Sequence, residues 1–165
     1  MNPPLILISI KQQYAEAILD GTKTVEFRKI SFPKRVGTMV LYATSPVKKI
    51  VGLVKVRAVV VLSPEGAWRK YHKRGAIDRR SFNAYYAGSK KAVCLELENP
   101  PPAAAGGVTR ISPHPTPPGA KAPGVRAKFV KAYRFRRPVD PKKADKGFRA
   151  PQSFRYLRAQ VYVTD

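Results

Sequence analysis

The chain has 165 residues, of which 32 are lysine or arginine and 10 are aspartate or glutamate, so its net charge is 32 − 10 = +22. This length is enough for one domain with a hydrophobic core. The charge indicates a polyanionic partner, because a large excess of one sign opposes compaction. The excess is not confined to a tail, since residues 1–98 and residues 99–165 each carry a net charge of +11.

The composition also argues against several classes of protein. Cys94 is the only cysteine, which excludes an intrachain disulfide and a cysteine-rich zinc site, and we expect it to be a buried small side chain. The two histidines have no metal-ligand spacing, so we expect no metal and no cofactor. No apolar run reaches the roughly 20 residues that cross a bilayer, and the N-terminus has no signal-peptide pattern. We therefore expect a soluble, cytoplasmic protein without a membrane partner.

The first half of the chain alternates strand and helix patterns. The apolar run over residues 5–10 predicts a buried strand. Residues 12–19 have apolar side chains at helical spacing and predict a two-turn helix that ends at Asp20 and Gly21. We expect three further strands, over residues 23–29, 38–44 and 50–62. Gly52 indicates a bulge in the last of these strands.

Two helix starts follow. Ser63 is typical of an N-cap, with Pro64 at the first helical position, and Asp78 is typical of a second N-cap. The second helix carries an aromatic stripe of Phe82, Tyr85 and Tyr86, which we interpret as core. A strand over residues 92–97 comes next.

Residues 99–125 break this pattern, because they hold 8 of the 16 prolines and four glycines without a helical or strand period. We interpret them as a surface loop, inserted at about residues 99–127 into a single domain over residues 1–165. Strand character returns at residues 128–137, and an irregular link is expected over 138–151. We expect the last strands over residues 153–157 and 160–163. About six strands and three short helices predict an α+β fold with a small mixed barrel.

The segment from Gly21 to Arg28 carries most of the chemical information. It places two cations, a carboxylate and a hydroxyl in one turn and one strand. Because side chains alternate along a strand, Val25 and Phe27 face one side, and Glu26 and Arg28 face the other. One interpretation is an edge strand with a solvated face, on which a Glu26–Arg28 ion pair contributes under about 1 kcal/mol. The other interpretation is a strand that belongs to a binding or catalytic site.

Several motifs resemble, in order and spacing, the ASCH domain, whose fold is related to the PUA domain. They include Ser9-Ile-Lys11, Gly21-x-Lys23-x-x-Glu26-x-Arg28, Tyr42-Ala-Thr-Ser-Pro46 and Ser63-Pro-x-x-x-Trp68. The resemblance covers residues 5–98 and about 128–163. The motif Ser63-Pro-x-x-x-Trp68 resembles the bacterial and phage branch that is often labelled as predicted transcriptional regulators. The resemblance to the ASCH domain implies a PUA-like mixed β-barrel of about six strands with two or three short helices. It also implies a cleft beside the Lys23–Arg28 strand that binds RNA or a modified base.

The first functional hypothesis is a nucleic-acid-binding module, with single-stranded RNA preferred over DNA. Lysine and arginine side chains would neutralise phosphates, aromatic rings would stack an unpaired base, and Glu26 would accept a hydrogen bond from a base amino group. The residues that we expect at this cleft are Lys11, Lys23, Glu26, Arg28, Tyr42, Ser45, Lys48, Phe154 and Tyr156.

The second hypothesis is a hydrolase that acts on RNA, as a ribonuclease, or on an acylated nucleoside, as an amidohydrolase; the family resemblance implies both activities. Surrounding cations would lower the pKa of Lys23, which would then act as a base that Glu26 orients. Tyr42 and Lys48 would stabilise a developing phosphate charge, and Ser153 would line the cleft. In the small amidohydrolase branch the position of Glu26 is a threonine, which argues against the same hydrolysis here.

A third hypothesis is a protein-interaction subunit that docks on nucleoprotein through its basic face. In that case residues 99–125 would form the recognition element.

Overall fold

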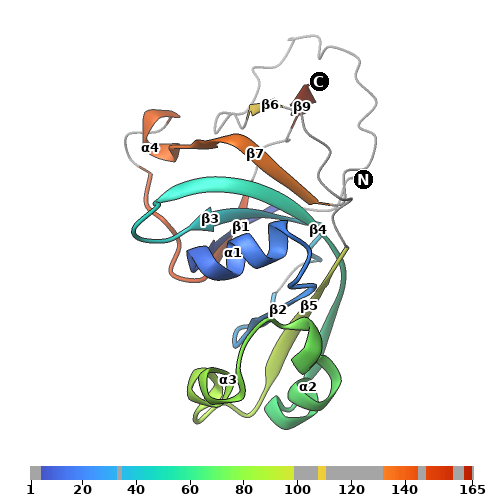
Figure 1. Cartoon of the computed structure of the whole chain (residues 1–165). Helices are drawn as coiled ribbons and strands as arrows, with labels where there is room; N and C mark the ends of the chain where they lie inside the picture. The colour runs from blue at the N-terminus through green and yellow to red at the C-terminus, as the bar shows by residue number, and fades with distance from the viewer. Residues whose placement is uncertain are drawn as a thin grey trace.

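A computed structural model describes residues 5–32, 35–98, 108–110, 132–144, 148–157 and 162–164 (Figure 1). The strands are β1 (Leu5–Ile10), β2 (Val25–Arg28), β3 (Thr38–Ala43), β4 (Lys49–Leu62), β5 (Ala92–Leu97), β6 (Val108–Arg110), β7 (Ala132–Val139), β8 (Phe154–Leu157) and β9 (Tyr162–Thr164). The helices are α1 (Gln12–Leu19), α2 (Pro64–Tyr71), the 3₁₀ helix η1 (His72–Arg74), α3 (Arg79–Tyr86) and α4 (Pro141–Ala144). The predicted α+β class is confirmed.

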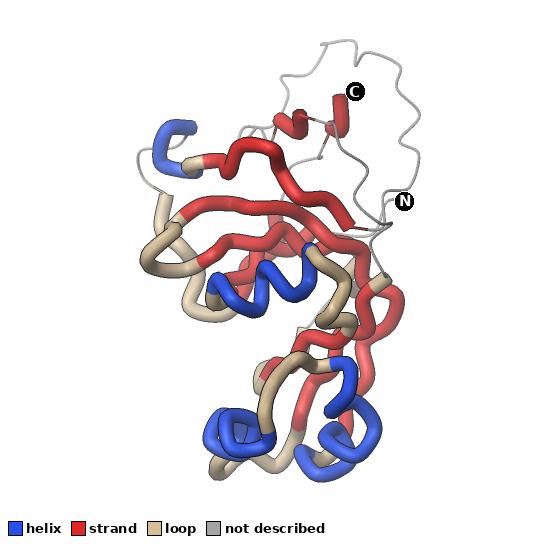
Figure 2. The backbone as a smooth tube through the Cα atoms, viewed as in Figure 1, coloured by secondary structure: helices blue, strands red, loops and turns tan. Residues whose placement is uncertain are grey.

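One seven-stranded sheet dominates the fold, with the order β2-β5-β4-β3-β1-β8 and with β7 paired to β4. β1 and β3 are parallel, whereas β4 runs antiparallel to β3, β5 and β7. The long β4 joins two halves of the molecule: residues 49–55 pair with β3, and residues 56–62 pair with β5 (Figure 2). Within the described residues the order ends at β2 and β8, so the sheet is open and the predicted barrel fits it only loosely.

Three apolar clusters hold these layers together. The largest lies between α1 and the sheet, where Ala15, Ile18 and Leu19 pack against the even-numbered residues of β1. A second cluster joins β2 and β5 to α2 and α3, and in it the Phe27 and Phe82 rings meet edge to face at 5.1 Å. A third covers the opposite face of β1 and β3 and includes Leu7 and Val40. Burial of these side chains is the main force that fixes the two halves.

The local signals in the sequence are confirmed. Gly21 has φ of +83° after the last turn of α1, the left-handed conformation that glycine adopts at helix ends. Ser63 and Asp78 cap α2 and α3, accepting hydrogen bonds from Gly66 N at 3.1 Å and Ser81 N at 2.9 Å. The pairing of β3 with β4 shifts register beside Gly52, where a bulge was expected.

Other segments differ in part from the expectation. The strand expected over 128–137 corresponds to β7 (Ala132–Val139), which continues two residues further, and residues 128–131 lie outside the described residues. The irregular link expected over 138–151 contains α4. Residues 108–110 of the expected loop form β6, which pairs with β9. Three-residue strands are too short to leave a period in the sequence, and only the tertiary fold brings their partners together. The remainder of the 99–127 segment lies outside the described residues.

The aromatic stripe of α3 is core at two positions only. Phe82 and Tyr86 are buried, whereas Tyr85 is 38% exposed and lies beneath Lys29, whose Nζ is 5.1 Å from its ring centroid. Cys94 is buried, as we expected, and burial raises the pKa of its thiol to about 11. None of the helices in the described part of the chain is long and apolar enough to cross a bilayer.

Candidate functional site

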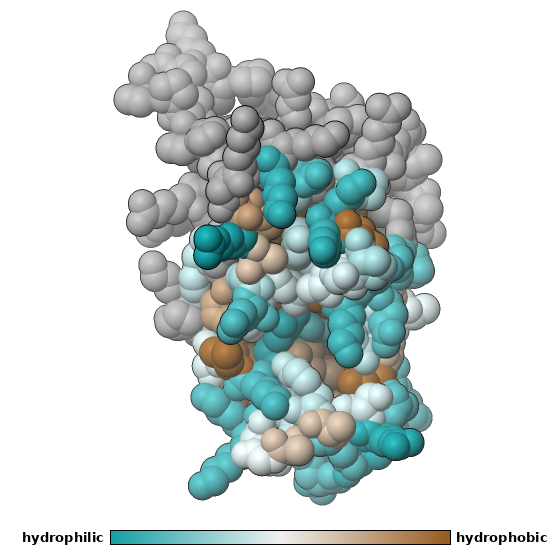
Figure 3. Space-filling model, turned by 90° about the vertical axis from the view of Figure 1, so that its left-hand side faces the viewer, coloured by the Kyte–Doolittle hydropathy of each residue, from teal (hydrophilic) through white to brown (hydrophobic). Residues whose placement is uncertain are grey.

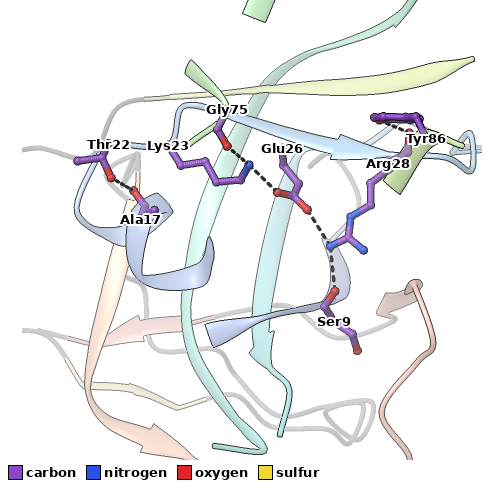
Figure 4. A network of polar contacts seen from close by, with 8 residues as sticks. All are labelled: Ser9, Ala17, Thr22, Lys23, Glu26, Arg28, Gly75 and Tyr86. Carbon is purple, nitrogen blue, oxygen red and sulfur yellow. Dashed lines mark hydrogen bonds and ion pairs between the residues drawn. The ribbon is translucent and has the colours of Figure 1, made fainter. Parts of the chain in front are cut away.

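Lys23, Glu26 and Arg28 form a buried chain of charges, which we call the central ion network (Figure 4). Glu26 lies between the two cations, with its oxygens 3.3 Å from Lys23 Nζ and 3.0 Å from Arg28 Nη2. The three residues are only 3%, 5% and 8% exposed. The interpretation of a solvated strand face is therefore wrong: β2 is at one end of the sheet, but its polar face is covered.

Lys23 is held at its charged end by a backbone carbonyl from another part of the chain. Its Nζ donates to Gly75 O at 2.5 Å. Gly75 approaches so closely that an added Cβ would overlap the Phe27 ring, which explains why this position is a glycine. The pKa of Lys23 is lowered, in the expected direction, but burial is the main cause and Glu26 opposes it; the neighbouring Arg28 is a smaller cause.

Arg28 connects β2 to β1 and keeps an unsatisfied donor. Its Nη2 donates to Ser9 O at 2.8 Å, and its own carbonyl accepts from the Tyr86 hydroxyl at 3.0 Å. Its Nε is buried and has no hydrogen-bond partner among the described residues. A buried donor without a partner costs about 1–3 kcal/mol, so such an atom in a native fold requires an explanation, for example a ligand.

The backbone of Ser9 joins this network to two other predicted site residues. Ser9 pairs with Tyr42 in the β1–β3 ladder, and its N donates to Ser153 O at 3.0 Å. The Ser9 hydroxyl donates to Pro151 O at 2.6 Å. Arg28, Tyr42 and Ser153, which are far apart in the sequence, therefore all lie around Ser9.

Tyr42 is nearly buried at this point. Its ring centroid is 5.5 Å from that of Phe148, and burial together with the charge of Asp140 raises the pKa of its hydroxyl. The phenol is therefore protonated at neutral pH and is able to donate a hydrogen bond.

Three exposed residues that the sequence predicts for the site lie just beyond the C-terminal ends of β1 and β3. Lys11 directly follows β1 and begins α1, and the turn after β3 contains Ser45 and Lys48. Thr44 N donates to Ile10 O at 2.9 Å, which keeps the turn beside the end of β1. Lys48 has φ of +51°, an uncommon conformation for a residue with a side chain. Hydrophilic side chains predominate on the face of the molecule drawn in Figure 3.

Of the three predicted aromatic residues, Phe154 and Tyr156 lie together, with ring centroids 5.9 Å apart, but Tyr42 does not join them. Phe154 and Tyr156 pair with Ile8 and Ile6 and pack with them in the cluster under α1. Tyr42 pairs with Ser9 and packs in the cluster on the other face. Because neighbouring residues of β1 point to opposite faces, Tyr42 is separated by the sheet from Phe154 and Tyr156.

The sequence reasoning missed two partners of the network, the carbonyls of Ser9 and Gly75. Every residue has a carbonyl, so no residue type indicates this role. A related contact was also missed: Arg74 Nε donates to Thr24 Oγ1 at 2.9 Å, and Thr24 N donates to Arg74 O at 2.9 Å. Gly75, a glycine at the end of a helical segment, was the one sequence signal close to these carbonyl groups.

Comparison with known proteins places this chain in a family. The chain is 32% identical over 97 residues to an ASCH domain-containing ribonuclease of Zymomonas mobilis, a match that covers 58% of this chain and 66% of that protein. It is 35% identical over 91 residues to a protein of Ureaplasma parvum described as large ribosomal subunit protein uL22, covering 54% of this chain but 29% of that one. The chain thus spans just under two thirds of the first relative and less than a third of the second.

The structure resembles the crystal structure of the ASCH protein of Zymomonas mobilis, with a TM-score of 0.68, 23% identity and coverage of 94% of this chain and 88% of that one. A variant of that protein with a serine replaced by alanine gives a TM-score of 0.68, 24% identity and coverage of 95% and 90%. Residues 8–101 match the family described as the ASCH domain. That match extends over more than half of the sequence, and the chain belongs to the ASCH domain family.

Proposed function

We propose that this chain is an RNA-binding domain that holds single-stranded RNA at the end of β1 and β3, in preference to DNA. The observation that carries the proposal is the guanidinium of Arg28, which is buried in a network of net charge +1 and retains an unpaired Nε. An anionic or carbonyl oxygen of a nucleotide would satisfy this donor. The family relative described as a ribonuclease supports RNA as the ligand class.

The use of the acidic residues supports the same function. Four glutamates of the described residues form ion pairs within the chain: Glu26, Glu65, Glu96 and Glu98. Asp78 caps α3 and Asp140 accepts from Lys142 N at 3.0 Å. Because these carboxylates make contacts within the chain, much of the net charge of +22 is available to bind a polyanion. Lys11 and Lys48 are exposed directly after β1 and in the turn after β3, and they would contact phosphates.

The experiment compares Arg28→Lys with Arg35→Lys, a control at an exposed arginine. Lysine keeps the charge at position 28 but has no Nε donor and no planar fork. We expect R28K to bind a labelled oligouridylate roughly tenfold more weakly than R35K, the difference expected for one charge-assisted hydrogen bond. The salt dependence would stay unchanged, because no charge is lost. For about five phosphate contacts the logarithmic slope would be roughly −3 to −4.

Two results would overturn the proposal. If the unmodified protein does not bind RNA at low salt, the chain is not an RNA-binding domain. If R28K binds as tightly as R35K while both remain folded by circular dichroism, Arg28 does not contact the ligand.

A second candidate is hydrolysis of RNA, which the description of the Zymomonas relative favours. Burial lowers the pKa of Lys23, which increases the fraction of neutral amine that is able to remove a proton from an attacking hydroxyl. However, Lys23 is only 3% exposed and its Nζ is bound to Gly75 O and Glu26. Direct proton transfer to a substrate would need a rearrangement at Gly75.

Lys23→Ala distinguishes the two candidates. If Lys23 is catalytic, cleavage of a labelled RNA under single-turnover conditions disappears in K23A while the affinity for RNA changes by less than about threefold, under roughly 0.7 kcal/mol. If the unmodified protein shows no cleavage under those conditions, hydrolysis is excluded for the RNAs tested, and the binding proposal stands on its own measurements.

A further inference from the structure

The α2–η1 segment presents a basic face that the proposed site does not use. Arg69 lies in the last turn of α2, and His72 and Lys73 lie in η1, which follows it directly; all three side chains are exposed. We call these three residues the α2 basic face. In Figure 1 the segment lies at the opposite end of the molecule from α4.

The charge of this face is not compensated within the described residues. The nearby carboxylates have other partners: Glu65 pairs with Arg79 at 2.6 Å, and Asp78 accepts from Ser81 N. The capping hydrogen bonds lower the pKa of Asp78, which therefore remains an ionised cap rather than a partner for a distant cation. Neither Arg69 nor Lys73 forms an ion pair in the part of the chain that the structure describes. Both cations are available to an anion.

An aromatic pair lies within the same face. The His72 ring stacks on Trp68 with centroids 5.4 Å apart and an interplanar angle of 28°. Trp68 is itself fixed, because its ring packs against Phe82 at 5.1 Å and lies 4.9 Å from the guanidinium carbon of Arg79. His72 Nδ1 lies 3.1 Å from Trp68 O, which restricts its ring. An exposed ring on a fixed aromatic support, between two cations, is an arrangement suited to stacking a nucleobase between neighbouring phosphates.

The backbone that follows the α2 basic face contacts residues of the proposed site. Arg74 follows Lys73 and forms two hydrogen bonds with Thr24, and Gly75 accepts from Lys23. The backbone between His72 and Gly75 therefore connects the exposed face to the central ion network over four residues. A single strand that extends beyond the Arg28 site would therefore have to reach only the residues that directly precede Arg74 to contact the α2 basic face.

We propose that the α2 basic face is a second RNA contact surface, which binds the part of a single strand that extends beyond the Arg28 site. Arg69 and Lys73 contact phosphates, and His72 stacks a base. This inference rests on the proposed function, because it assigns a further part of the same ligand. It implies that affinity rises with RNA length after the first site is filled.

The test uses labelled oligouridylates of five and fifteen nucleotides and the double variant R69Q/K73Q. The control is R149Q/K142Q, which removes one arginine and one lysine at exposed positions near α4. For the fifteen-nucleotide RNA we expect R69Q/K73Q to weaken binding roughly tenfold and to reduce the logarithmic salt slope by about 1.4, two contacts at about 0.7 each. The five-nucleotide RNA would bind R69Q/K73Q and the control equally. His72→Ala would weaken binding of the long RNA alone, roughly tenfold.

The outcomes separate the two proposals. If the unmodified protein binds neither RNA, the proposed function fails, and this inference fails with it. If the long RNA binds R69Q/K73Q and R149Q/K142Q equally well, the α2 basic face is not an RNA contact, and the proposed function stands. The same conclusion follows if H72A and R69Q/K73Q weaken the binding of the short and the long RNA equally. Such a result would reflect the lower net charge of the protein or its misfolding. Thermal denaturation of each variant identifies misfolding.

Discussion

The central ion network makes a quantitative prediction about Glu26. Glu26→Gln keeps the shape of the side chain but removes the one carboxylate of the network, and this leaves Lys23 and Arg28 buried without a counter-charge. Removing one partner of a buried ion pair costs about 3–5 kcal/mol. We therefore expect E26Q to lower the free energy of unfolding by about 3–5 kcal/mol, a large fraction of the 5–15 kcal/mol typical of a domain.

Lys23→Met makes the complementary change. It leaves Glu26 and Arg28 as a balanced pair, and methionine fills most of the space of the lysine chain. Because burial already disfavours the charged amine, the main cost is the unsatisfied carbonyl of Gly75, about 1–3 kcal/mol. The double variant K23M/E26Q retains a single buried cation instead of two. It should therefore be more stable than the sum of the single effects indicates, by about 1–3 kcal/mol.

Urea denaturation followed by circular dichroism measures all four proteins, with Glu65→Gln as the control. The carboxylate of Glu65 pairs with Arg79 at the surface, with the two side chains 59% and 42% exposed, so this substitution should cost under about 1 kcal/mol. The reasoning is refuted if E26Q is as stable as E65Q, or if the effects of K23M and E26Q simply add.

Three further predictions concern other parts of the structure. Tyr71→Phe removes the buried hydroxyl that donates to Glu96 at 2.6 Å, and we expect it to lower the free energy of unfolding by about 1.5–3 kcal/mol at neutral pH. That hydrogen bond helps to hold the pKa of Glu96 below its usual range. The stabilisation from the bond is therefore present above about pH 4.5 and is lost as the pH falls below that value. The difference in free energy of unfolding between Y71F and the unmodified protein should be smaller at pH 3 than at pH 7. Gly75→Ala forces a Cβ into the Phe27 ring and should cost about 1–3 kcal/mol while weakening RNA binding; a protein of unchanged melting temperature would contradict the close approach. Ser63→Ala removes the cap of α2 and should cost about 1 kcal/mol by urea denaturation without altering the affinity for a five-nucleotide RNA, and a loss of that affinity would mean that α2 supports the Arg28 site.

Local signals in the sequence determined the elements that depend on near neighbours. The bounds expected for β1, α1 and β5 match those observed, because each has a period of apolar residues and clear end signals. The caps at Ser63 and Asp78 depend on backbone groups only three residues away. The spacing of the motifs also indicated the ASCH family, which the comparison confirms.

The environment of the central ion network was decided by the tertiary structure. Lys23 and Glu26 were identified from the motif, but the sequence left open whether they are solvated or buried. Their burial depends on Gly75, which is 52 residues from Lys23, and on the contact of Arg28 with β1. Such contacts form between backbone carbonyls and side chains that have no common local pattern.

The same reason explains the aromatic residues. Tyr42, Phe154 and Tyr156 are equally suited to stacking by composition, and only the pairing of β1 with β3 and β8 places them on opposite faces of the sheet. The sequence alone therefore determined which residues have side chains of the chemical types proposed for nucleotide binding, because residue type and local spacing are sufficient for that. The tertiary structure decided which of them share a surface, because strand pairing brings together positions as distant as Ser9 and Pro151, 142 residues apart.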